Sequence, residues 1–198
     1  MGYTHYWYRK KEIDGEIYDL IVKDFKKLLP LFKVLDIPLA NGVGDGEPII
    51  NNDEVVFNGS CNCGHPKNNL ISIPWPADKT KFGTAPNSKQ AVVGSWFAGV
   101  TLNQRTCNGD CSYETFDFPK VMDIRDYQKP DGGKYFNCTK TAYRPYDLVV
   151  QVFLVIAKHY MKNDLIVSSD GDYSQWLDAV QITNNAFGYG LEDFKLRD

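Results

Sequence analysis

The segment from residue 145 to about 161 constrains the fold most, because apolar residues cover almost its whole surface when it is drawn as a helix. Pro145 suits the first turn of a helix. The apolar run LVVQVFLVIA at 148–157 is too short to cross a bilayer and contains Gln151. A helix that is apolar nearly all round must be enclosed by other elements. The sequence therefore predicts a central buried helix.

Shorter patterns supply the elements around this helix. Strands are expected where strand-favouring residues alternate or cluster, at residues 2–9, 54–58, 113–118 and 165–167. One further helix is expected from Asp14, with Pro30 kinking or ending it near Leu29, and a last one over about 173–187 with Asp172 as its cap. Residues 123–140 are expected to be mostly loop. These elements predict a single α+β domain over residues 1–198, with a mixed or antiparallel sheet of about four to six strands covered by about three helices.

Composition and charge exclude several classes of protein. Hydrophobic residues make up 43% of the 198 residues and the net charge is −3, so the chain can bury a core and is not expected to be disordered. The absence of a basic face argues against general nucleic-acid binding. The opening MGYTHYWYRK has no apolar signal region. We therefore expect a soluble, cytoplasmic protein without a membrane segment.

Four of the five cysteines bracket a region of different character. Residues 61–112 are rich in Pro, Asn, Gly and Lys, which is typical of a loop-rich insertion; Cys61 and Cys63 begin it, and Cys107 and Cys111 end it. Two thiolate pairs at the ends of one insertion predict a structural zinc site with these four cysteines as ligands. Three alternatives stay open: His65 replaces one cysteine, the cysteines form disulfides, or they remain reduced.

Five blocks in order resemble a family of uncharacterised bacterial and phage proteins. These blocks are MGYTHYW at the start, FNG at 57–59, ETF at 114–116, KTAYRPYD at 140–147 and SSDGD at 168–172. The family carries no established activity, so the resemblance implies a shared fold but no reaction. Compact members run from FNG to ETF with a short link, which is why residues 61–112 are interpreted as an insertion.

Polar and aromatic residues in or beside these blocks predict a ligand site. The aromatic residues could stack on a flat ring, and two cations near a helix start suit a phosphate or carboxylate. Each cation or carboxylate also has a structural interpretation, such as an Arg144–Asp147 ion pair, Asp172 as a cap, or Asn58 and Glu114 satisfying each other. The predicted ligand-binding residues are His5, Tyr6, Trp7, Asn58, Glu114, Lys140, Arg144, Asp170 and Asp172.

Together these features favour a protein that binds an anionic, nucleotide-like small molecule. The phage members of the resembling family suggest sequestration of a host signalling nucleotide. Two other functions stay open. One is an enzyme acting on such a molecule, with Asp170, Glu114 or His5 as acid or base. The other is an inhibitor of a host protein partner that uses the insertion as its contact surface. No catalytic residue is assigned.

Overall fold

The computed structural model describes residues 2–65, 70–71 and 105–197, so most of the predicted insertion, residues 66–69 and 72–104, lies outside the described residues. Three α-helices and nine strands follow one another in the described residues. In chain order they are β1 (Thr4–Arg9), α1 (Gly15–Val34), β2 (Leu39–Ala40), β3 (Ile49–Ile50), β4 (Glu54–Gly59), β5 (Leu70–Ile71), β6 (Arg105–Thr106), β7 (Phe116–Pro119), β8 (Tyr135–Lys140), α2 (Asp147–Met161), β9 (Leu165–Ser169) and α3 (Leu177–Phe187).

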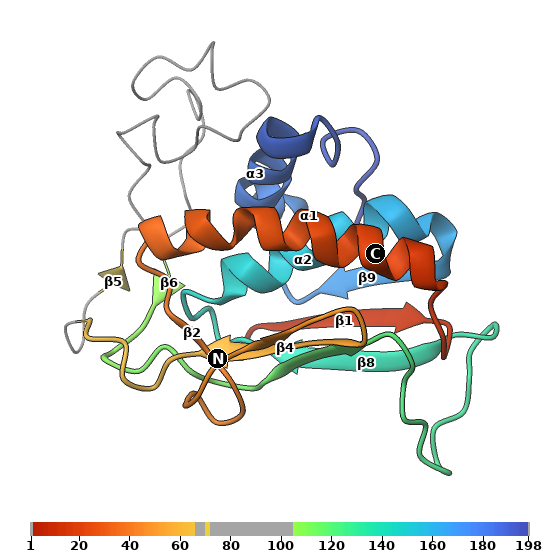
Figure 1. Ribbon diagram of the computed structural model, residues 1–198, viewed down its shortest axis with the longest axis horizontal. Coiled ribbons are helices and arrows are strands. Elements are labelled where there is room, and N and C mark those ends of the chain that lie inside the picture. Colours follow the sequence, from red (N-terminus) through yellow and green to blue (C-terminus); the bar gives the residue numbers. More distant parts are fainter. Residues whose placement is uncertain (1, 66–69, 72–104, 198) are drawn as a thin grey trace.

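The strands form two principal antiparallel sheets. One has the order β8-β1-β9, and the other has the order β2-β4-β3 with β7 also paired to β4. Strands β5 and β6 pair with each other where the insertion leaves and re-enters the described residues. The helices lie on one side of the strands (Figure 1). This arrangement confirms the predicted α+β class, with the strands divided between two sheets.

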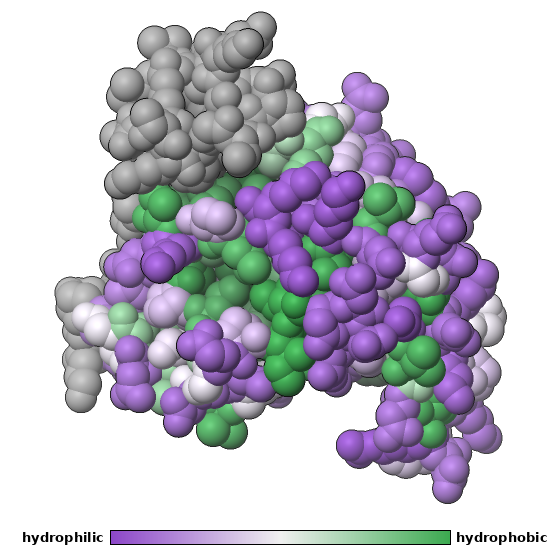
Figure 2. Space-filling view, viewed as in Figure 1, coloured by the Kyte–Doolittle hydropathy of each residue, from purple (hydrophilic) through white to green (hydrophobic). Residues whose placement is uncertain are grey.

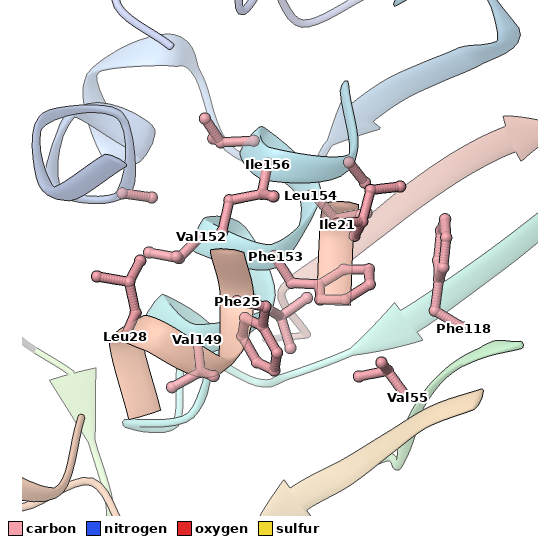
Figure 3. Close-up of a cluster of buried hydrophobic side chains, with 14 of the residues drawn as sticks. Ile21, Phe25, Leu28, Val55, Phe118, Val149, Val152, Phe153, Leu154 and Ile156 are labelled. Carbon is pink, nitrogen blue, oxygen red and sulfur yellow. The ribbon is translucent and has the colours of Figure 1, made fainter. Parts of the chain in front are cut away.

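Helix α2 is the buried centre of the protein, as the sequence predicts. Twelve of its 15 residues are buried, and it packs against α1, α3 and β9. Phe153 lies in the middle of this packing (Figure 3), with its ring centroid 5.1 Å from that of Phe25 and 5.0 Å from that of Phe118. One side chain of α2 therefore joins α1 to the second sheet.

Strand β1 alternates as expected, and its buried face is unusual. Trp7 faces the core together with two basic residues, His5 and Arg9, each of which is fully buried. The intervening side chains, among them Tyr6 and Tyr8, lie on the other face and are partly exposed. Buried His and Arg side chains need polar partners, so β1 must carry contacts that apolar packing does not supply.

Two features of the elements differ from what the sequence favoured. Of the two alternatives for Pro30, the end of the helix is excluded, because α1 continues through Pro30 to Val34. Pro30 lies on the exposed side of the helix, while Leu31 and Phe32 are 2% and 1% exposed. Burial of these two side chains outweighs the backbone hydrogen bond that a proline removes from a helix.

The second difference is strand β8: most of residues 123–140 is loop, as expected, but the last six residues of this range form a strand that was not predicted. All six residues of β8, Tyr135–Lys140, pair with β1 in register. Its side chains are mostly exposed or half-buried, so the strand depends on its hydrogen bonds to β1 more than on a hydrophobic pattern.

The described surface carries one notable apolar groove. Figure 2 shows hydrophobic side chains gathered below α1 among hydrophilic ones, where a groove of about 470 Å³ is lined mainly by Leu29, Phe32, Ile37, Leu39 and Ile50. Among the described residues, no helix combines the length and the apolar character that a membrane span requires.

Removing the central ring should destabilise the protein much more than removing an exposed ring of the same type. We expect Phe153→Ala to lower the free energy of unfolding by about 3–5 kcal/mol, because the substitution leaves a cavity between α2, α1 and the second sheet. The matched control is Phe136→Ala, since Phe136 is 43% exposed. Urea unfolding of both variants measures the difference, and equal losses would contradict the central role of Phe153.

Candidate functional site

Four potential metal ligands come together at the base of the insertion. The Sγ atoms of Cys63, Cys107 and Cys111 and a ring nitrogen of His65 all lie within 4.8 Å of one another. The Sγ atoms of Cys63 and Cys107 are 3.1 Å apart, and His65 Nδ1 is 3.1 Å from Cys111 Sγ. This group could hold a metal ion.

The backbone around the cluster is shaped to bring the ligands together. Asn108 and Gly109 adopt positive φ angles of 57° and 80°, so the chain turns back and places Cys111 Sγ 3.0 Å from Cys107 Sγ. The end of β4 approaches this turn so closely that a Cβ on Gly59 would lie 1.9 Å from the Cys111 carbonyl oxygen. Only glycine fits there, which gives the FNG block a structural reason.

Hydrogen bonding orients His65 for metal binding. Its Nε2 lies 3.2 Å from Asp36 Oδ2. When Nε2–H donates to this carboxylate, the lone pair of Nδ1 faces the three sulfur atoms. A carboxylate that fixes the histidine tautomer in this way is the common outer partner of a metal-binding histidine.

The burial of the thiols also explains why their ionised forms need a cation. Burial raises the pKa of Cys107 and of Cys111, and for Cys111 the neighbouring thiols raise it further. Several buried thiolates without a cation would repel one another. A divalent ion removes this repulsion and displaces the thiol protons as it binds.

The ligand set differs from the predicted one in a single residue. Cys61 lies outside the cluster, and its sulfur accepts a long hydrogen bond of 3.5 Å from Asn62 Nδ2. His65 takes its place, which is the substitution that the sequence analysis left open. The five cysteines, all of them described, are free thiols, so the structure contains no disulfide framework.

A second polar cluster is buried where α2 begins. Asp147 Oδ1 accepts hydrogen bonds from His5 Nε2 at 2.7 Å and from Thr141 Oγ1 at 2.5 Å. Asp147 Oδ2 lies 3.3 Å from Arg105 Nε. All four of these side chains are buried. Arg105 also donates to Asp178 at 3.1 Å and to Gln151 at 3.0 Å.

Asp147 is ionised in this environment. Burial opposes its ionisation, but His5, Arg105 and the Thr141 hydroxyl outweigh burial and hold the pKa of Asp147 below its ordinary value. A carboxylate only accepts hydrogen bonds. His5 Nε2 must therefore carry a proton, whether the ring is neutral or charged.

Ser169 connects this buried cluster to a cavity. Its Oγ lies 3.0 Å from His5 Nδ1 and accepts a hydrogen bond of 3.1 Å from the backbone N–H of Gly171. Ser169, Gly171, Asp172 and Tyr173 line a cavity of about 580 Å³, and residues 191–192 and 194–197 form its other wall. A volume of this size suits a small-molecule ligand. The SSDGD loop thus borders a cavity, as a ligand-binding loop would.

The aromatic residues predicted to bind a ligand lie elsewhere. Trp7 is 1% exposed and packs between core rings, 5.3 Å from Phe116 and 6.0 Å from Phe118, so it cannot form the wall of a ligand pocket. Tyr6 lies on the opposite face of β1 from His5, and its hydroxyl donates to Asp170 Oδ1 at 2.8 Å. The alternation of a strand separates His5 from Tyr6, so the two do not line one pocket.

The remaining predicted residues either make structural contacts or line the cavity. Asn58 is fully buried and its amide donates to the carbonyl oxygens of Gly42 and Tyr113, and not to Glu114. Glu114 accepts from the backbone N–H of Lys140 at 2.7 Å.

The two predicted cations do not meet at the start of α2. Lys140 Nζ lies over the ring of Tyr113, 5.6 Å from its centroid. Arg144 Nη1 donates to the carbonyl oxygen of Cys107, so it supports the metal-cluster turn, and its predicted ion pair with Asp147 is replaced by the one from Arg105. Asp172 caps the short helix Tyr173–Trp176 together with Gln175, as predicted, and also lines the cavity.

Sequence reasoning missed Arg105 and Thr141 as partners of Asp147. Neither has a neighbour in the sequence that marks it. One signal was available, the alternation of side chains along β1. His5 lies two residues before Trp7 and therefore on the same face, so it had to face the core and find a polar partner there.

Comparisons of the chain with protein-family models, with curated proteins and with solved structures find no match. The family resemblance of the five sequence blocks therefore stays a prediction. Three of the blocks nevertheless meet at one place in the structure, because they supply His5, Asp147 and Ser169 respectively.

The buried carboxylate should make stability depend on pH. The native pKa of Asp147 lies below its ordinary value, so its contribution is complete above about pH 4, the unfolded value, and is lost as the pH falls through the native pKa. We expect Asp147→Asn to be less stable than the natural protein at neutral pH, and the difference to shrink between about pH 5 and pH 2. Urea unfolding of both proteins across this range measures it. A difference that stays constant with pH would contradict an ionised Asp147.

Proposed function

We propose that the protein binds one zinc ion through Cys63, His65, Cys107 and Cys111, and that this structural centre fastens both ends of the insertion to the α+β core. The observation that carries the proposal is the convergence of the four ligand atoms within 4.8 Å. Two of the ligands lie at the beginning of the insertion and two lie at its end.

The chemistry of the donor set favours zinc. Three thiolates and one imidazole form a common tetrahedral zinc set, in which sulfur lies about 2.3 Å from the metal. Sulfur atoms at two corners of such a tetrahedron are about 3.8 Å apart, so the cluster, with sulfur contacts of 3.0 and 3.1 Å, needs only a small expansion. Four protein ligands leave no open position for substrate, which is the pattern of a structural site.

The surroundings join this centre to the rest of the protein. Cys111 N–H donates to the Ser60 carbonyl oxygen at 3.0 Å, and Cys61 N–H donates to the Gly44 carbonyl oxygen at 2.8 Å. Arg144 holds the Cys107 carbonyl oxygen from the start of α2. Zinc in this position would therefore stabilise the second sheet, the base of the insertion and the loop before α2 together.

Elemental analysis of freshly purified protein should find about one zinc per chain. Cys111→Ser should lose most of this zinc and lower the melting temperature, because a serine oxygen is a poor substitute for a buried thiolate. Cys138→Ser is the matched control, since Cys138 is exposed and outside the cluster. Zinc in Cys111→Ser at the level of the control would contradict the proposal. Loss of zinc in Cys61→Ser together with retention in His65→Ala would restore the four-cysteine site predicted from the sequence.

We propose as a second function that the cavity beside loop 168–172 binds a nucleotide-like small molecule. Tyr173, which is 38% exposed, supplies the aromatic surface that Trp7 does not. Lys195 and Arg197 lie in the same lining with Asp172 and Glu192. The lining charges balance in number, so a ligand with a polar, partly anionic group beside a flat ring fits better than a highly charged anion.

Incubation with a panel of nucleotides tests this second function. We expect retained, chemically intact ligand, and we expect Tyr173→Ala to weaken binding by roughly five- to a hundredfold, because stacking of a base on an aromatic ring contributes about 1–3 kcal/mol. Tyr127→Ala is the control, because Tyr127 is 72% exposed and does not line the cavity. Equal affinities of the two variants, measured by titration calorimetry, would contradict the proposed site.

A further inference from the structure

The contact between Ser169 and His5 lies at the boundary between cavity and core. Ser169 lines the cavity and is partly exposed, whereas His5 behind it and Asp147 behind His5 are both fully buried. The distances along this line are 3.0 Å from Ser169 Oγ to His5 Nδ1 and 2.7 Å from His5 Nε2 to Asp147 Oδ1. A molecule in the cavity would meet the serine hydroxyl first.

The hydrogen bonds determine where the serine proton points. Gly171 N–H already donates to Ser169 Oγ, and His5 Nε2 donates to the ionised Asp147. In the neutral ring, Nδ1 then carries a lone pair. The Ser169 hydroxyl has His5 Nδ1 as an acceptor at 3.0 Å, which is closer than the Thr4 carbonyl oxygen at 3.5 Å, and the Tyr3 hydroxyl also interacts with it. This is the arrangement of a nucleophile with a general base, and either imidazole nitrogen can serve as the base.

A further hydroxyl lies at this place. Tyr3 is 9% exposed, and its Oη is buried and interacts with the side chain of Ser169. It lies 2.2 Å from the position that a Cβ on Gly171 would take, which explains why residue 171 is glycine. The Tyr3 hydroxyl is therefore beside Ser169, close to the place where a ligand in the cavity would meet the serine oxygen.

We propose that Ser169 is the nucleophile of an esterase reaction on a small carboxylic ester bound in this cavity, with His5 as general base and Asp147 as the residue that positions His5. The proposal relies on the cavity being the ligand site, and it adds a covalent step to the binding proposed above. Tyr3 Oη is assigned as a hydrogen-bond donor to the negative charge that develops on the ester oxygen.

The reaction balances with water as the only co-reactant. Ser169 Oγ attacks the ester carbonyl carbon while its proton passes to His5 Nδ1. The bond from carbon to the alcohol oxygen then breaks, and the leaving alcohol takes the proton from Nδ1. Water attacks the acyl group on Ser169 and gives a proton to Nδ1. Collapse of this intermediate releases the carboxylic acid and returns the proton to Oγ.

The partners of Asp147 keep its carboxylate in place behind His5 during this cycle. Arg105 carries one positive charge between Asp147 and Asp178. Arg105 and Thr141 also prevent Asp147 from turning away, so the ring of His5 keeps its orientation.

A small alkyl fluorophosphonate tests the nucleophile directly, because a new bond from Oγ to phosphorus displaces fluoride from the probe. We expect one adduct per chain by intact mass, located on Ser169 by peptide mapping of the zinc-loaded, full-length protein. Ser169→Ala should abolish the adduct. Ser168→Ala is the matched control and should react normally, because residue 168 lies on the opposite face of β9. Release of p-nitrophenol from p-nitrophenyl acetate should follow the same order.

Two more variants distinguish a catalytic Ser169 from one whose hydrogen bonds only stabilise the fold. His5→Gln keeps a donor for Asp147 but removes the base, and should slow adduct formation by about a hundredfold or more. Tyr3→Phe should slow it by about a hundredfold while the protein stays folded, because the phenyl ring keeps the packing of the tyrosine and loses only the hydroxyl beside Ser169.

Three results would overturn the inference. The first is the absence of an adduct on Ser169 in folded natural protein. The others are unchanged labelling rates in His5→Gln or in Tyr3→Phe. Failure here is distinct from failure of the binding proposal. A nucleotide retained intact without any adduct supports binding and rejects catalysis, whereas an adduct on Ser169 without nucleotide retention supports catalysis and rejects a nucleotide as the ligand.

Discussion

The buried carboxylate of Asp147 is the interaction on which the arrangement of this protein depends. A charge in the interior is stable only when partners replace the water that it has lost. Those partners come from distant parts of the chain: His5 lies 142 positions before Asp147, and Arg105 lies 42 positions before it. Removing one partner of a buried ion pair typically costs about 3–5 kcal/mol, so β1, β6 and the start of α2 are held in one relative position.

The same residues connect the buried charges to the cysteine–histidine cluster. Arg105 lies in β6, two residues before Cys107, and Arg144 reaches from the loop before α2 to the Cys107 carbonyl oxygen. The segment that re-enters the core from the insertion is therefore held at two points. Arg105 of this segment pairs with Asp147, and Cys107 and Cys111 of the same segment contribute thiols to the metal cluster. A chain without residues 61–112 would lack Arg105 and would need another partner for Asp147.

The sequence predicts those features that leave a local pattern. The apolar run of α2, the alternation of β1 and the cap at Asp172 each depend on near neighbours, and each appears in the structure. Strand β8 left no pattern because its stability comes from pairing with β1. The metal cluster was predictable to within one ligand. Whether Cys61 or His65 points inward depends on the turn at Gly64, where φ is 76°, and spacing alone does not determine such a turn.

The Ser169, His5 and Asp147 line could not be predicted from spacing, because its members are far apart in the chain and each has an ordinary local role. Ser169 ends strand β9, and Asp147 begins a helix. Only the position of His5 on the same face of the strand as Trp7 indicated that a polar side chain in the core needed a hydrogen-bond partner. A core histidine that only filled space would need no contact with a cavity. The structure places its second nitrogen against the partly exposed Ser169 hydroxyl instead, so the chain of buried polar contacts that includes Arg105 reaches the wall of the cavity.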